Sequence, residues 1–319
     1  MAPLELVPPL GRYFTFLKPM EPRSAEKPFD SPEHLFQVKW DGVRILAFIE
    51  EGRVRLQNRK GGCRTKQYPE LQVLPQLVRG RELLLDGEVV VMEEGRPSFP
   101  RVIQRDFCRR ESTIRALVRH RPCTYCVFDL LYLDGKDLTG RPFLERQQIL
   151  QEILLSQAPV YLNDNFSGGV QLYREVEQRG LEGIVAKEKE SPYRFGEKGR
   201  SWLKIKPRRR LLCVVGGLAW REGTVRALLL GGYREEELLY IGRAGSGLSH
   251  RHRLMLGEFA RRHRREKPPF VNPPRERDCL WLEPTLTVWI SFFEWTAGLS
   301  LRAPVVEGFS DRRPAEAKL

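Results

Sequence analysis

The chain is organised around residues 36–44, which read FQVKWDGVR. An apolar run leads to Lys39, and the pair Asp41-Gly42 and then Arg44 follow it. Asp-Gly favours a tight turn, so one interpretation is a surface β-turn with flanking charges. The other interpretation is chemical, because lysine becomes a nucleophile when it loses its proton, whereas arginine stays protonated. The remaining sequence has to supply the partners that a reactive lysine needs.

Length and composition indicate a folded protein of two domains. The chain has 319 residues, of which 41% are hydrophobic and 30% charged, and single cores stop growing at roughly 250–300 residues. The sequence has no run of about 18 apolar residues, so we expect no membrane-spanning helix. The N-terminal residues lack the basic and apolar segments of a signal peptide, which predicts an intracellular, cytoplasmic protein.

The charge of the chain favours an anionic partner. The formal net charge is +13, a surplus typical of proteins that bind nucleic acid or a membrane surface. No basic amphipathic segment with an aromatic face stands out, so we expect nucleic acid and no membrane. The last 113 residues carry 20 basic and 13 acidic side chains, against 34 and 28 in the first 206. The C-terminal part is therefore the more basic per residue, although a solvated charged surface would explain that equally well.

The six cysteines are predicted to be thiols, because disulfides are rare in intracellular proteins. Cys123 and Cys126 have the spacing of a zinc-binding pair, but both fall in an apparent strand that would point them to opposite sides. No second pair accompanies them in the sequence. Buried thiols are therefore favoured over zinc.

Hydrophobic periodicity predicts mixed structure in the first two thirds of the chain. One strand is expected from Leu35 to Glu50, interrupted at Asp41-Gly42. Further strands are expected over 53–58, 83–91, 125–132, 183–187 and 202–206. Helices are expected over 105–119, 143–156 and 170–179.

The pattern changes at Pro207 and the three arginines after it, which marks a domain boundary. Beyond it, strands are expected over 213–220, 224–233 and 238–243, then a helix over 249–265 and further strands between 280 and 295. Three strands, a helix and more strands is the order of a small OB-type barrel.

Side chains suited to nucleotide chemistry recur along the predicted strands. Attaching a nucleotide to lysine needs cations around the phosphate, carboxylates for a divalent metal and a platform for the base, all converging on the amine. The chain supplies these in order: Lys39, Arg59, Glu88, Phe128, Glu182, Lys204 and Lys206. Each alone has an ordinary alternative, namely a core position for the phenylalanine, ion pairs for the glutamates and a solvated strand face for the last two lysines.

This ordered set resembles the ATP-dependent DNA ligases, above all the ligase module of bacterial end-joining ligases. The resemblance covers nearly the whole chain. It rests on six segments: Lys39–Arg44 (KWDGVR), Asn58–Gly61 (NRKG), Asp86–Glu88 (DGE), Phe128–Tyr132 (FDLLY), Glu182–Lys187 (EGIVAK) and Trp202–Lys206 (WLKIK). Glu294–Thr296 and Leu301–Pro304 resemble the end of that family's OB domain. Asp-Gly-Glu alone is a weak signal, whereas the ordered series is a strong one.

The resemblance implies a role for each central side chain. Lys39 would carry AMP through a phosphoramide bond, Glu88 would hold the ribose, and Phe128 would stack on the adenine. Lys204 and Lys206 would contact the AMP phosphate.

The resemblance also implies ATP and either Mg²⁺ or Mn²⁺ as cofactors. Glu182 and Glu88 would serve the metal, with Asp41 as a further carboxylate beside them. Four more residues would bind the nucleotide or the 5′-phosphate of DNA: Gln37, Arg44, Arg59 and Lys187.

Two positions depart from the family's pattern. The residue two before the lysine is usually glutamate in these ligases and is Gln37 here. The family's last motif, Arg-x-Asp-Lys, aligns with residues 310–313, which read SDRR. In the family this motif orients pyrophosphate as ATP attacks lysine, so we expect slow self-adenylation and normal sealing of a nick that already carries 5′-AMP.

The sequence therefore predicts an α+β protein, with a nucleotidyltransferase domain (ATP-grasp-like, as in DNA ligases) over residues 1–207 and an OB-fold β-barrel domain over 208–319. It would join a 5′-phosphate to a 3′-hydroxyl in nicked or broken double-stranded DNA, in repair or end joining. We expect a monomer at the bacterial or archaeal nucleoid, with any Ku-like end-binding protein or repair polymerase as a separate partner. Alternatives are an RNA ligase, a GTP-dependent capping-type nucleotidyltransferase, or a nucleic-acid-binding relative with weak catalysis.

Overall fold

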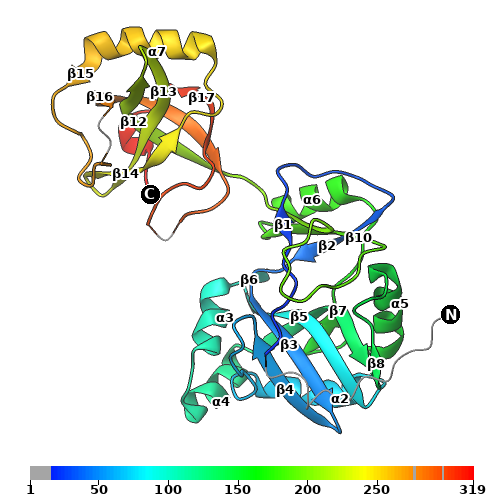
Figure 1. Ribbon diagram of the computed structural model, residues 1–319. Coiled ribbons are helices and arrows are strands. Elements are labelled where there is room, and N and C mark those ends of the chain that lie inside the picture. The colour runs from blue at the N-terminus through cyan, green and yellow to red at the C-terminus, as the bar shows by residue number, and fades with distance from the viewer. Residues whose placement is uncertain (1–15, 276–277, 297) are drawn as a thin grey trace. The chain divides into compact units, whose positions relative to one another are not determined.

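The computed structural model describes residues 16–275, 278–296 and 298–319, and the chain forms two compact units (Figure 1). Unit 1 is Met1–Lys206 and unit 2 is Pro207–Leu319. The break falls at a proline, which cannot donate a ladder hydrogen bond and so cannot continue the strand before it. No helix in the described part of the chain is long and apolar enough to cross a membrane.

Unit 1 contains two sheets. Its strands are β1 (Arg23–Ser24), β2 (His34–Lys39), β3 (Val43–Glu50), β4 (Arg53–Asn58), β5 (Glu82–Glu93), β6 (Arg96–Pro97), β7 (Cys123–Leu133), β8 (Lys136–Asp137), β9 (Val160–Leu162), β10 (Gly183–Glu188) and β11 (Trp202–Ile205). The larger sheet has the order β4-β3-β5-β7-β8, with β6 beside β5 and β9 beside β7, and the smaller sheet has the order β1-β11-β10-β2. Strands far apart in sequence therefore become neighbours in the smaller sheet.

Helices cover both sheets of unit 1. They are η1 (Pro69–Val73), α2 (Leu74–Leu77), α3 (Phe99–Asp106), α4 (Glu111–His120), α5 (Phe143–Ile153) and α6 (Gly169–Gln178). Leu172 and Val176 of α6 pack on Phe36, Ile184 and Ile205 of the smaller sheet. This packing holds β2, β10 and β11 together as one rigid layer.

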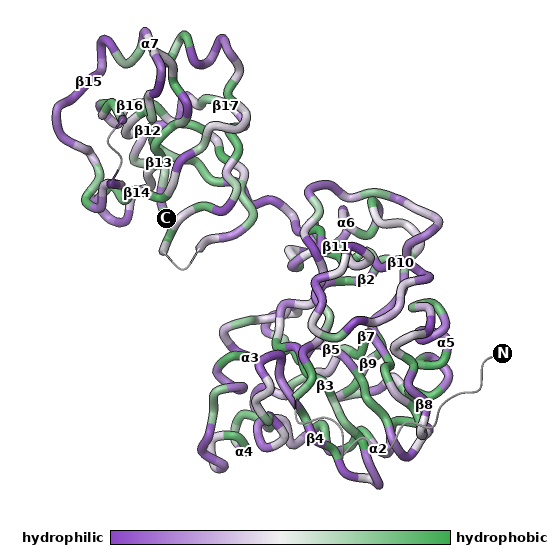
Figure 2. Tube along the Cα trace, in the orientation of Figure 1, coloured by the Kyte–Doolittle hydropathy of each residue, from purple (hydrophilic) through white to green (hydrophobic). Residues whose placement is uncertain are grey.

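The larger sheet is buried on both faces. Along β3, Ile45, Ala47 and Ile49 enter one core, while Leu46 and Phe48 enter the core on the opposite face. A strand buried on both sides reads as a continuous apolar run rather than an alternating one. Figure 2 shows the apolar colour following the strands of this sheet.

The expectation of a single interrupted strand over 35–50 is wrong. β2 belongs to the smaller sheet and β3 to the larger one, so residues 40–42 carry the chain from one sheet to the other. A Cβ atom on Gly42 would lie 2.2 Å from the carbonyl oxygen of Val89 on β5. Only glycine permits this approach, and it places Lys39 at the junction between the two sheets.

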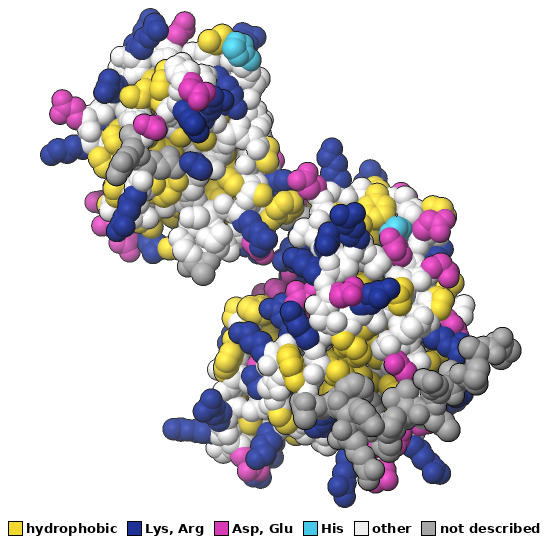
Figure 3. Space-filling view, in the orientation of Figure 1, with side chains coloured by type: hydrophobic (Ala, Val, Ile, Leu, Met, Phe, Trp, Pro, Cys, Tyr) yellow, Lys and Arg dark blue, Asp and Glu magenta, His cyan; other side chains and the backbone are white. Residues whose placement is uncertain are grey.

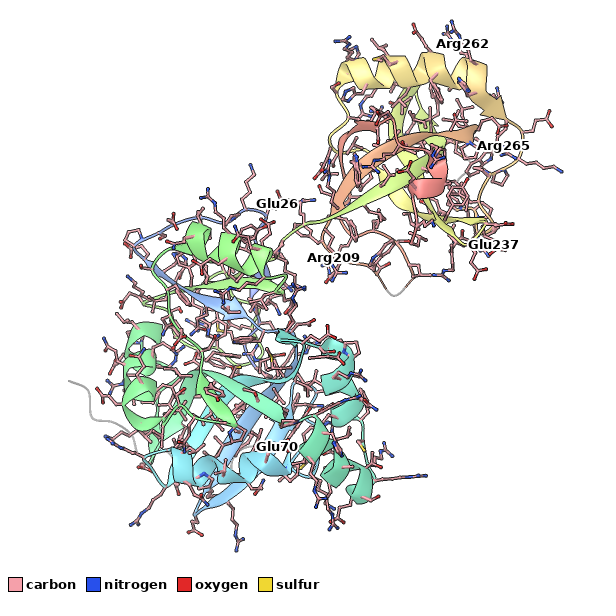
Figure 4. The ribbon with its side chains drawn as sticks, turned by 180° about the vertical axis from the view of Figure 1, so that it is seen from behind. Glu26, Glu70, Arg209, Glu237, Arg262 and Arg265 are labelled. Carbon is pink, nitrogen blue, oxygen red and sulfur yellow. The ribbon has the colours of Figure 1, made fainter. Side chains whose placement is uncertain are left out.

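The helix expected over 105–119 is also wrong, because α3 and α4 are separate helices. Pro100 lies in the first turn of α3, where its missing N–H costs nothing. Arg105 is buried at the other end of α3 and donates to the Gln67 carbonyl oxygen at 2.8 Å and to Glu70 at 2.6 Å. Glu70 lies in η1, and Figure 4 labels it. This long-range pairing fixes the end of α3, which local periodicity cannot reveal.

Unit 2 is the expected OB-fold barrel. Its elements are β12 (Arg209–Arg221), β13 (Thr224–Arg234), β14 (Glu237–Ala244), α7 (His250–His263), β15 (Arg264–Arg265), β16 (Cys279–Phe292), β17 (Val305–Ser310) and η2 (Pro314–Glu316). The order is β14-β13-β12-β16-β15, with β17 beside β16. A parallel bridge between Ser246, just after β14, and Val305 of β17 curls the sheet back on itself. The Ser249 hydroxyl caps α7 by accepting from the His252 N–H at 3.1 Å.

Candidate active site

Strand register gathers the candidate residues at one end of the smaller sheet. Lys39 of β2 lies opposite Gly183 of β10, and Ile184 lies opposite Ile205 of β11. Glu182 and Lys206 directly adjoin these paired positions in the sequence. Three residues separated by up to 167 positions are therefore brought together by backbone pairing alone.

Lys39, Glu182 and Lys206 form a linked ion triplet. The Lys39 Nζ lies 2.5 Å from Glu182 Oε2, and the Lys206 Nζ lies 2.8 Å from Glu182 Oε1. All three side chains are partly exposed, at 23%, 16% and 23%. Lys39 has to leave this pair and lose a proton before it can attack an electrophile. Lys206 would remain with Glu182 and keep a positive charge at the site.

The backbone beside Glu182 has a special conformation. Gly183 has a φ of +149°, and a Cβ atom there would lie 2.3 Å from the carbonyl oxygen of Ile205. A side chain at this position would push β10 and β11 apart. Gly183 therefore holds Glu182 close to both lysines.

Glu88 lies on β5 of the larger sheet, opposite Arg44 on β3. Burial raises the pKa of Glu88 to about 8, although the positive charges of Lys39 and Arg44 oppose the shift. Its carboxyl group therefore holds a proton at neutral pH. A protonated carboxyl can donate a hydrogen bond to a sugar hydroxyl, whereas binding a metal requires it to lose that proton.

Arg44 is held by the protein itself. Its guanidinium donates to Asp86 at 2.9 and 2.5 Å, to the Met20 carbonyl oxygen at 2.6 Å and to the Tyr193 hydroxyl at 3.2 Å. Tyr193 in turn donates to Asp86 at 2.7 Å. These bonds use four of the five guanidinium N–H groups. Most of the hydrogen-bonding capacity of Arg44 is therefore used within the protein. Its predicted contact with the nucleotide or the DNA 5′-phosphate depends on the remaining N–H.

Lys187 and Phe128 share an aromatic cage. The Lys187 Nζ lies 4.5 Å from the ring centre of Phe128, 4.0 Å from that of Trp202 and 4.6 Å from that of Phe143. It donates to the Phe128 carbonyl oxygen at 3.2 Å. Burial lowers the pKa of Lys187 to about 7, against the opposing charges of Asp129 and Asp86. The half-buried Phe128 ring thus lies beside a lysine that can lose its proton near neutral pH.

Lys187→Met is expected to stabilise the protein below pH 7. Lysine in the unfolded chain keeps its proton up to about pH 10.4, whereas buried Lys187 begins to lose it near pH 7. Between these values the unfolded state binds more protons, so wild-type stability rises with pH over that window. Below pH 7 the folded protein carries the full free-energy cost of burying the charged Lys187. Methionine has no charge, so the substitution should increase the free energy of unfolding by about 1–4 kcal/mol.

Urea denaturation at pH 6, 8 and 10 measures this effect, with exposed Lys136→Met as the control. The advantage of Lys187→Met should shrink as the pH rises, while the control should show no such trend. A variant that is less stable than wild type at pH 6 would contradict the expectation.

The other predicted site residues occupy different positions. Gln37 is 1% exposed and lies two residues before Lys39 on β2. Lys204 lies on β11 two residues before Lys206, and Asp41 is half-buried in the crossing between the sheets. Arg59 lies in an exposed loop, where its Nη1 is 3.8 Å from Glu21 Oε1. The contact of Arg59 with the nucleotide or the DNA 5′-phosphate stays a prediction.

A metal ion at this site would need phosphate oxygens as well as carboxylates. Within the described residues, no group of three or more His, Cys, Asp or Glu side chains is placed to hold a metal ion. Magnesium in ATP-using enzymes is usually held by one or two carboxylates together with phosphate oxygens. Glu182, next to two lysines that suit phosphate, fits that kind of site. Glu88 fits it once it has lost its proton.

Sequence patterns assigned no role to several residues that hold the site residues in place. Asp86 and Tyr193 hold Arg44, and Gln147 and Asn165 hold Gln37. A carboxylate inside the apolar run 83–91 was a signal for Asp86. No sequence pattern pointed to Gln147, Asn165 or Tyr193, because the residues they bond to lie more than 100 positions away in the chain.

Family models of known proteins match both units of this chain. A family model described as "ATP dependent DNA ligase domain" matches residues 18–206, and one described as "ATP dependent DNA ligase C terminal region" matches residues 221–313. The "Multifunctional non-homologous end joining protein LigD" of Mycobacterium bovis is 32% identical over 293 residues, covering 88% of this chain and 37% of that protein. A "DNA ligase" of Thermococcus fumicolans is 29% identical, covering 89% of this chain and 53% of that protein.

Solved structures show the same likeness. The ligase domain from M. tuberculosis LigD superimposes with a TM-score of 0.56 at 30% identity, covering 95% of this chain and 98% of that one. A mycobacterial DNA ligase D complexed with ATP and MES gives a TM-score of 0.54 at 30% identity, with the same coverage. The chain thus spans about a third of the full LigD proteins and nearly all of their ligase domain.

Proposed function

We propose, from the premise that this chain belongs to the ATP-dependent DNA ligase family, that it seals breaks in double-stranded DNA by way of an AMP bound to Lys39. The observation that carries this proposal is the ion triplet, in which strand register sets Lys39 beside Glu182 and Lys206. The relatives named for non-homologous end joining favour end joining or repair as the setting.

The first step joins AMP to the protein. The Lys39 amine gives up a proton and attacks the α-phosphorus of ATP, so that an N–P bond forms while the P–O bond to pyrophosphate breaks. Lys206 and Lys204 stabilise the charge that spreads over the phosphate oxygens. Phe128 stacks on the adenine, and Glu88 donates to the ribose.

The later steps pass the nucleotide to DNA. An oxygen of the DNA 5′-phosphate attacks the AMP phosphorus, and the N–P bond to Lys39 breaks. The 3′-hydroxyl then loses its proton and attacks the 5′-phosphorus. A new P–O bond forms, the P–O bond to AMP breaks, and AMP leaves with the bridging oxygen. The amine of Lys39 regains its proton and returns to Glu182.

Glu182, with Asp41 beside it, would hold the divalent metal, and Glu88 would serve the metal only in the steps in which it has lost its proton and does not donate to the ribose. When bound, Mg²⁺ or Mn²⁺ neutralises phosphate charge and orients the reacting oxygens. Gln37, Arg44, Arg59 and Lys187 complete the nucleotide and 5′-phosphate contacts in this proposal. The same proposal assigns adenylation to residues 1–207 and DNA contact to the OB domain, 208–319.

The basic surface of the chain supports DNA as the substrate. Lys and Arg side chains are spread over the visible face of each unit (Figure 3). In unit 2, Arg262 lies on α7 and Arg265 on the short strand after it (Figure 4). Contacts between such basic side chains and DNA phosphates supply affinity but do not depend on the base sequence. As a ligase of chromosomal DNA, the protein would work as a monomer at the nucleoid, with a Ku-like protein and a repair polymerase as separate partners.

Label transfer from α-labelled ATP or GTP to the purified protein tests the proposal, followed by sealing of a nicked duplex. Label from ATP together with sealed DNA supports it. Label from GTP alone would point to a capping-type enzyme, and sealing of RNA in preference to DNA would point to an RNA ligase. Slow labelling with rapid sealing of a pre-adenylated nick is the pattern expected from residues 310–313.

Glu182→Ala and Lys204→Ala are each expected to reduce sealing about 100-fold or more, because both serve charge stabilisation at the phosphate. The exposed positions Glu190→Ala and Lys136→Ala are matched controls and should seal as wild type does. Single-turnover sealing rates measure the loss of catalysis, and melting temperatures measure any loss of stability. Melting temperatures that fall in parallel with activity would show that the site residues are structural.

A further inference from the structure

β2, the strand that carries Lys39, lies at the edge of the smaller sheet. It is the last strand in the order β1-β11-β10-β2, so β10 pairs with only one of its two sides. Along the outer side of an edge strand, the N–H and C=O groups have no partner in the ladder. Such a strand opens more readily than one inside a sheet. A nucleophile on β2 therefore needs other contacts to hold its position.

The segment after β9 binds this outer side of β2. Phe36 and Phe166 exchange both backbone hydrogen bonds, each with an N–O distance of 2.8 Å. Phe36 and Val38 are two residues apart, so their backbone groups point to the same side of the strand. The carbonyl oxygen of Val38 accepts from Asn163 Nδ2 at 3.1 Å. The Asn163 side chain thus supplies the partner that a neighbouring strand would supply inside a sheet.

The same side chain also holds the residue that follows the nucleophile. Trp40 Nε1 donates to Asn163 Oδ1 at 3.0 Å. Residues 40–42 carry the chain from the smaller sheet to the larger one, so this bond fixes the start of the crossing. Asn163 is 5% exposed. One buried amide therefore holds Lys39 through the residue before it and through the residue after it.

The two partners fix the orientation of the Asn163 amide. A backbone carbonyl can only accept a hydrogen bond, and an indole N–H can only donate one. The NH₂ group of the amide therefore has to face Val38, and its oxygen has to face Trp40. Aspartate at this position would keep the acceptor for Trp40 but would place a second oxygen against the Val38 carbonyl. Leucine, which is similar in size, would serve neither partner.

Asn163 is itself fixed to the larger sheet. Its backbone N–H donates to the carbonyl oxygen of Val127 at 2.7 Å. Val127 directly precedes Phe128, the proposed base platform, on β7. β9, which ends one residue before Asn163, pairs in parallel with residues 125–127 of β7. Asn163 therefore connects the strand of the base platform with the strand of the nucleophile.

We propose that Asn163 is a positioning residue for Lys39. It acts through the backbone of β2 and not by contact with ATP. It sets where the amine lies relative to the base platform, and hence relative to the α-phosphorus of a nucleotide stacked there. A displacement of about 1 Å between reacting groups can cost about 100-fold in rate. This inference rests on the proposed function, because it concerns the same reaction.

The decisive experiment makes three measurements on Asn163→Leu in the full chain. At saturating ATP and Mg²⁺, adduct formation at Lys39 should be about 10- to 100-fold slower than in wild type. The dissociation constant of ATP, measured by calorimetry without metal so that no adduct forms, should change by less than about 3-fold. Sealing of a nick that already carries 5′-AMP should also stay within about 3-fold of wild type, because it forms no N–P bond.

This difference between the three measurements distinguishes positioning from a purely structural role. Loss of packing alone would lower ATP affinity and nick sealing together with adduct formation. Parallel losses of all three in a folded variant would overturn the inference, and so would an unchanged rate of adduct formation.

Asn272→Leu is the matched control. The Asn272 amide also makes one hydrogen bond of each kind, since it accepts from the Tyr240 N–H at 2.7 Å and donates to the Tyr240 carbonyl oxygen at 3.2 Å. Both residues lie in unit 2, away from β2 in the fold. This variant should form the adduct at the wild-type rate.

Two further variants separate the halves of the contact. Asn163→Asp keeps the bond from Trp40 and loses the one to Val38, whereas Trp40→Phe loses the indole donor and keeps an aromatic ring. Each should slow adduct formation by about 3- to 30-fold. The double variant Trp40→Phe with Asn163→Leu should be no slower than Asn163→Leu alone, because the donor has no partner left to lose. Effects that multiply would show that the two residues act independently and would overturn the inference.

Failure of this inference can be told from failure of the proposed function. If Asn163→Leu does not fold, the same three measurements on Trp40→Phe decide the question. A wild-type protein that forms no adduct at Lys39 would sink the ligase function, and the inference with it. If wild type forms the adduct and the Asn163 and Trp40 variants form it at the same rate, the ligase function stands and the inference alone is overturned.

Discussion

Lys39→Arg is expected to abolish covalent labelling by ATP, with a loss of at least about 1,000-fold in adduct formation. Arginine keeps a positive charge beside Glu182 but stays protonated at any working pH, so it cannot attack phosphorus. The fold should survive, because the Lys39 side chain is partly exposed and an arginine at this position can still form an ion pair with Glu182. Mass spectrometry of the intact protein after incubation with ATP and Mg²⁺ measures the adduct, and peptide mapping locates it.

Two controls make this prediction specific. Lys206→Arg alters the other cation of the ion triplet and should still form the adduct, although more slowly. Lys39→Arg should also keep most of its ability to seal a nick that already carries 5′-AMP, because that reaction needs no new N–P bond. An adduct of normal yield on a residue other than 39 would refute the assignment of the nucleophile.

Asp129→Ala is expected to destabilise unit 1 by about 3–5 kcal/mol. Asp129 and Arg146 are both fully buried, and the guanidinium donates to the carboxylate at 2.8 and 2.9 Å. Removing the carboxylate leaves a buried charge whose remaining partners are the carbonyl oxygens of Arg141 and Ser191. The loss should appear as a lower urea midpoint for the unit 1 transition.

The exposed pair Glu111–Arg115 is the matched control. Its side chains are 79% and 70% exposed, and such a pair contributes only about 0.3–0.5 kcal/mol. Glu111→Ala should therefore leave the midpoint almost unchanged. The double substitution Asp129→Ala with Arg146→Met should recover much of the lost stability, because it removes the unpaired charge. A single Asp129→Ala variant as stable as wild type would show that water reaches this pair.

The sequence alone determined the two-domain organisation and the ligase resemblance. Alternating and continuous apolar runs predicted most strands, because the core selects side chains at fixed spacing. Pro207 marked the end of the strand-forming pattern, and the structure divides between Lys206 and Pro207. The motifs KWDGVR, EGIVAK and WLKIK are local and ordered, so they could be read without knowing which strands pair.

The tertiary structure decided which of these motifs meet and what each side chain does. Lys39, Glu182 and Lys206 become one ion triplet through the register of three strands, and register is set by long-range pairing that no local pattern reveals. The same long-range contacts tie Arg44 to Asp86 and leave Arg59 in an exposed loop. Gln37 looked like a neutral substitute for glutamate in the sequence. Its amide is held by amides 110 and 128 residues away, and only the folded chain brings those partners to it.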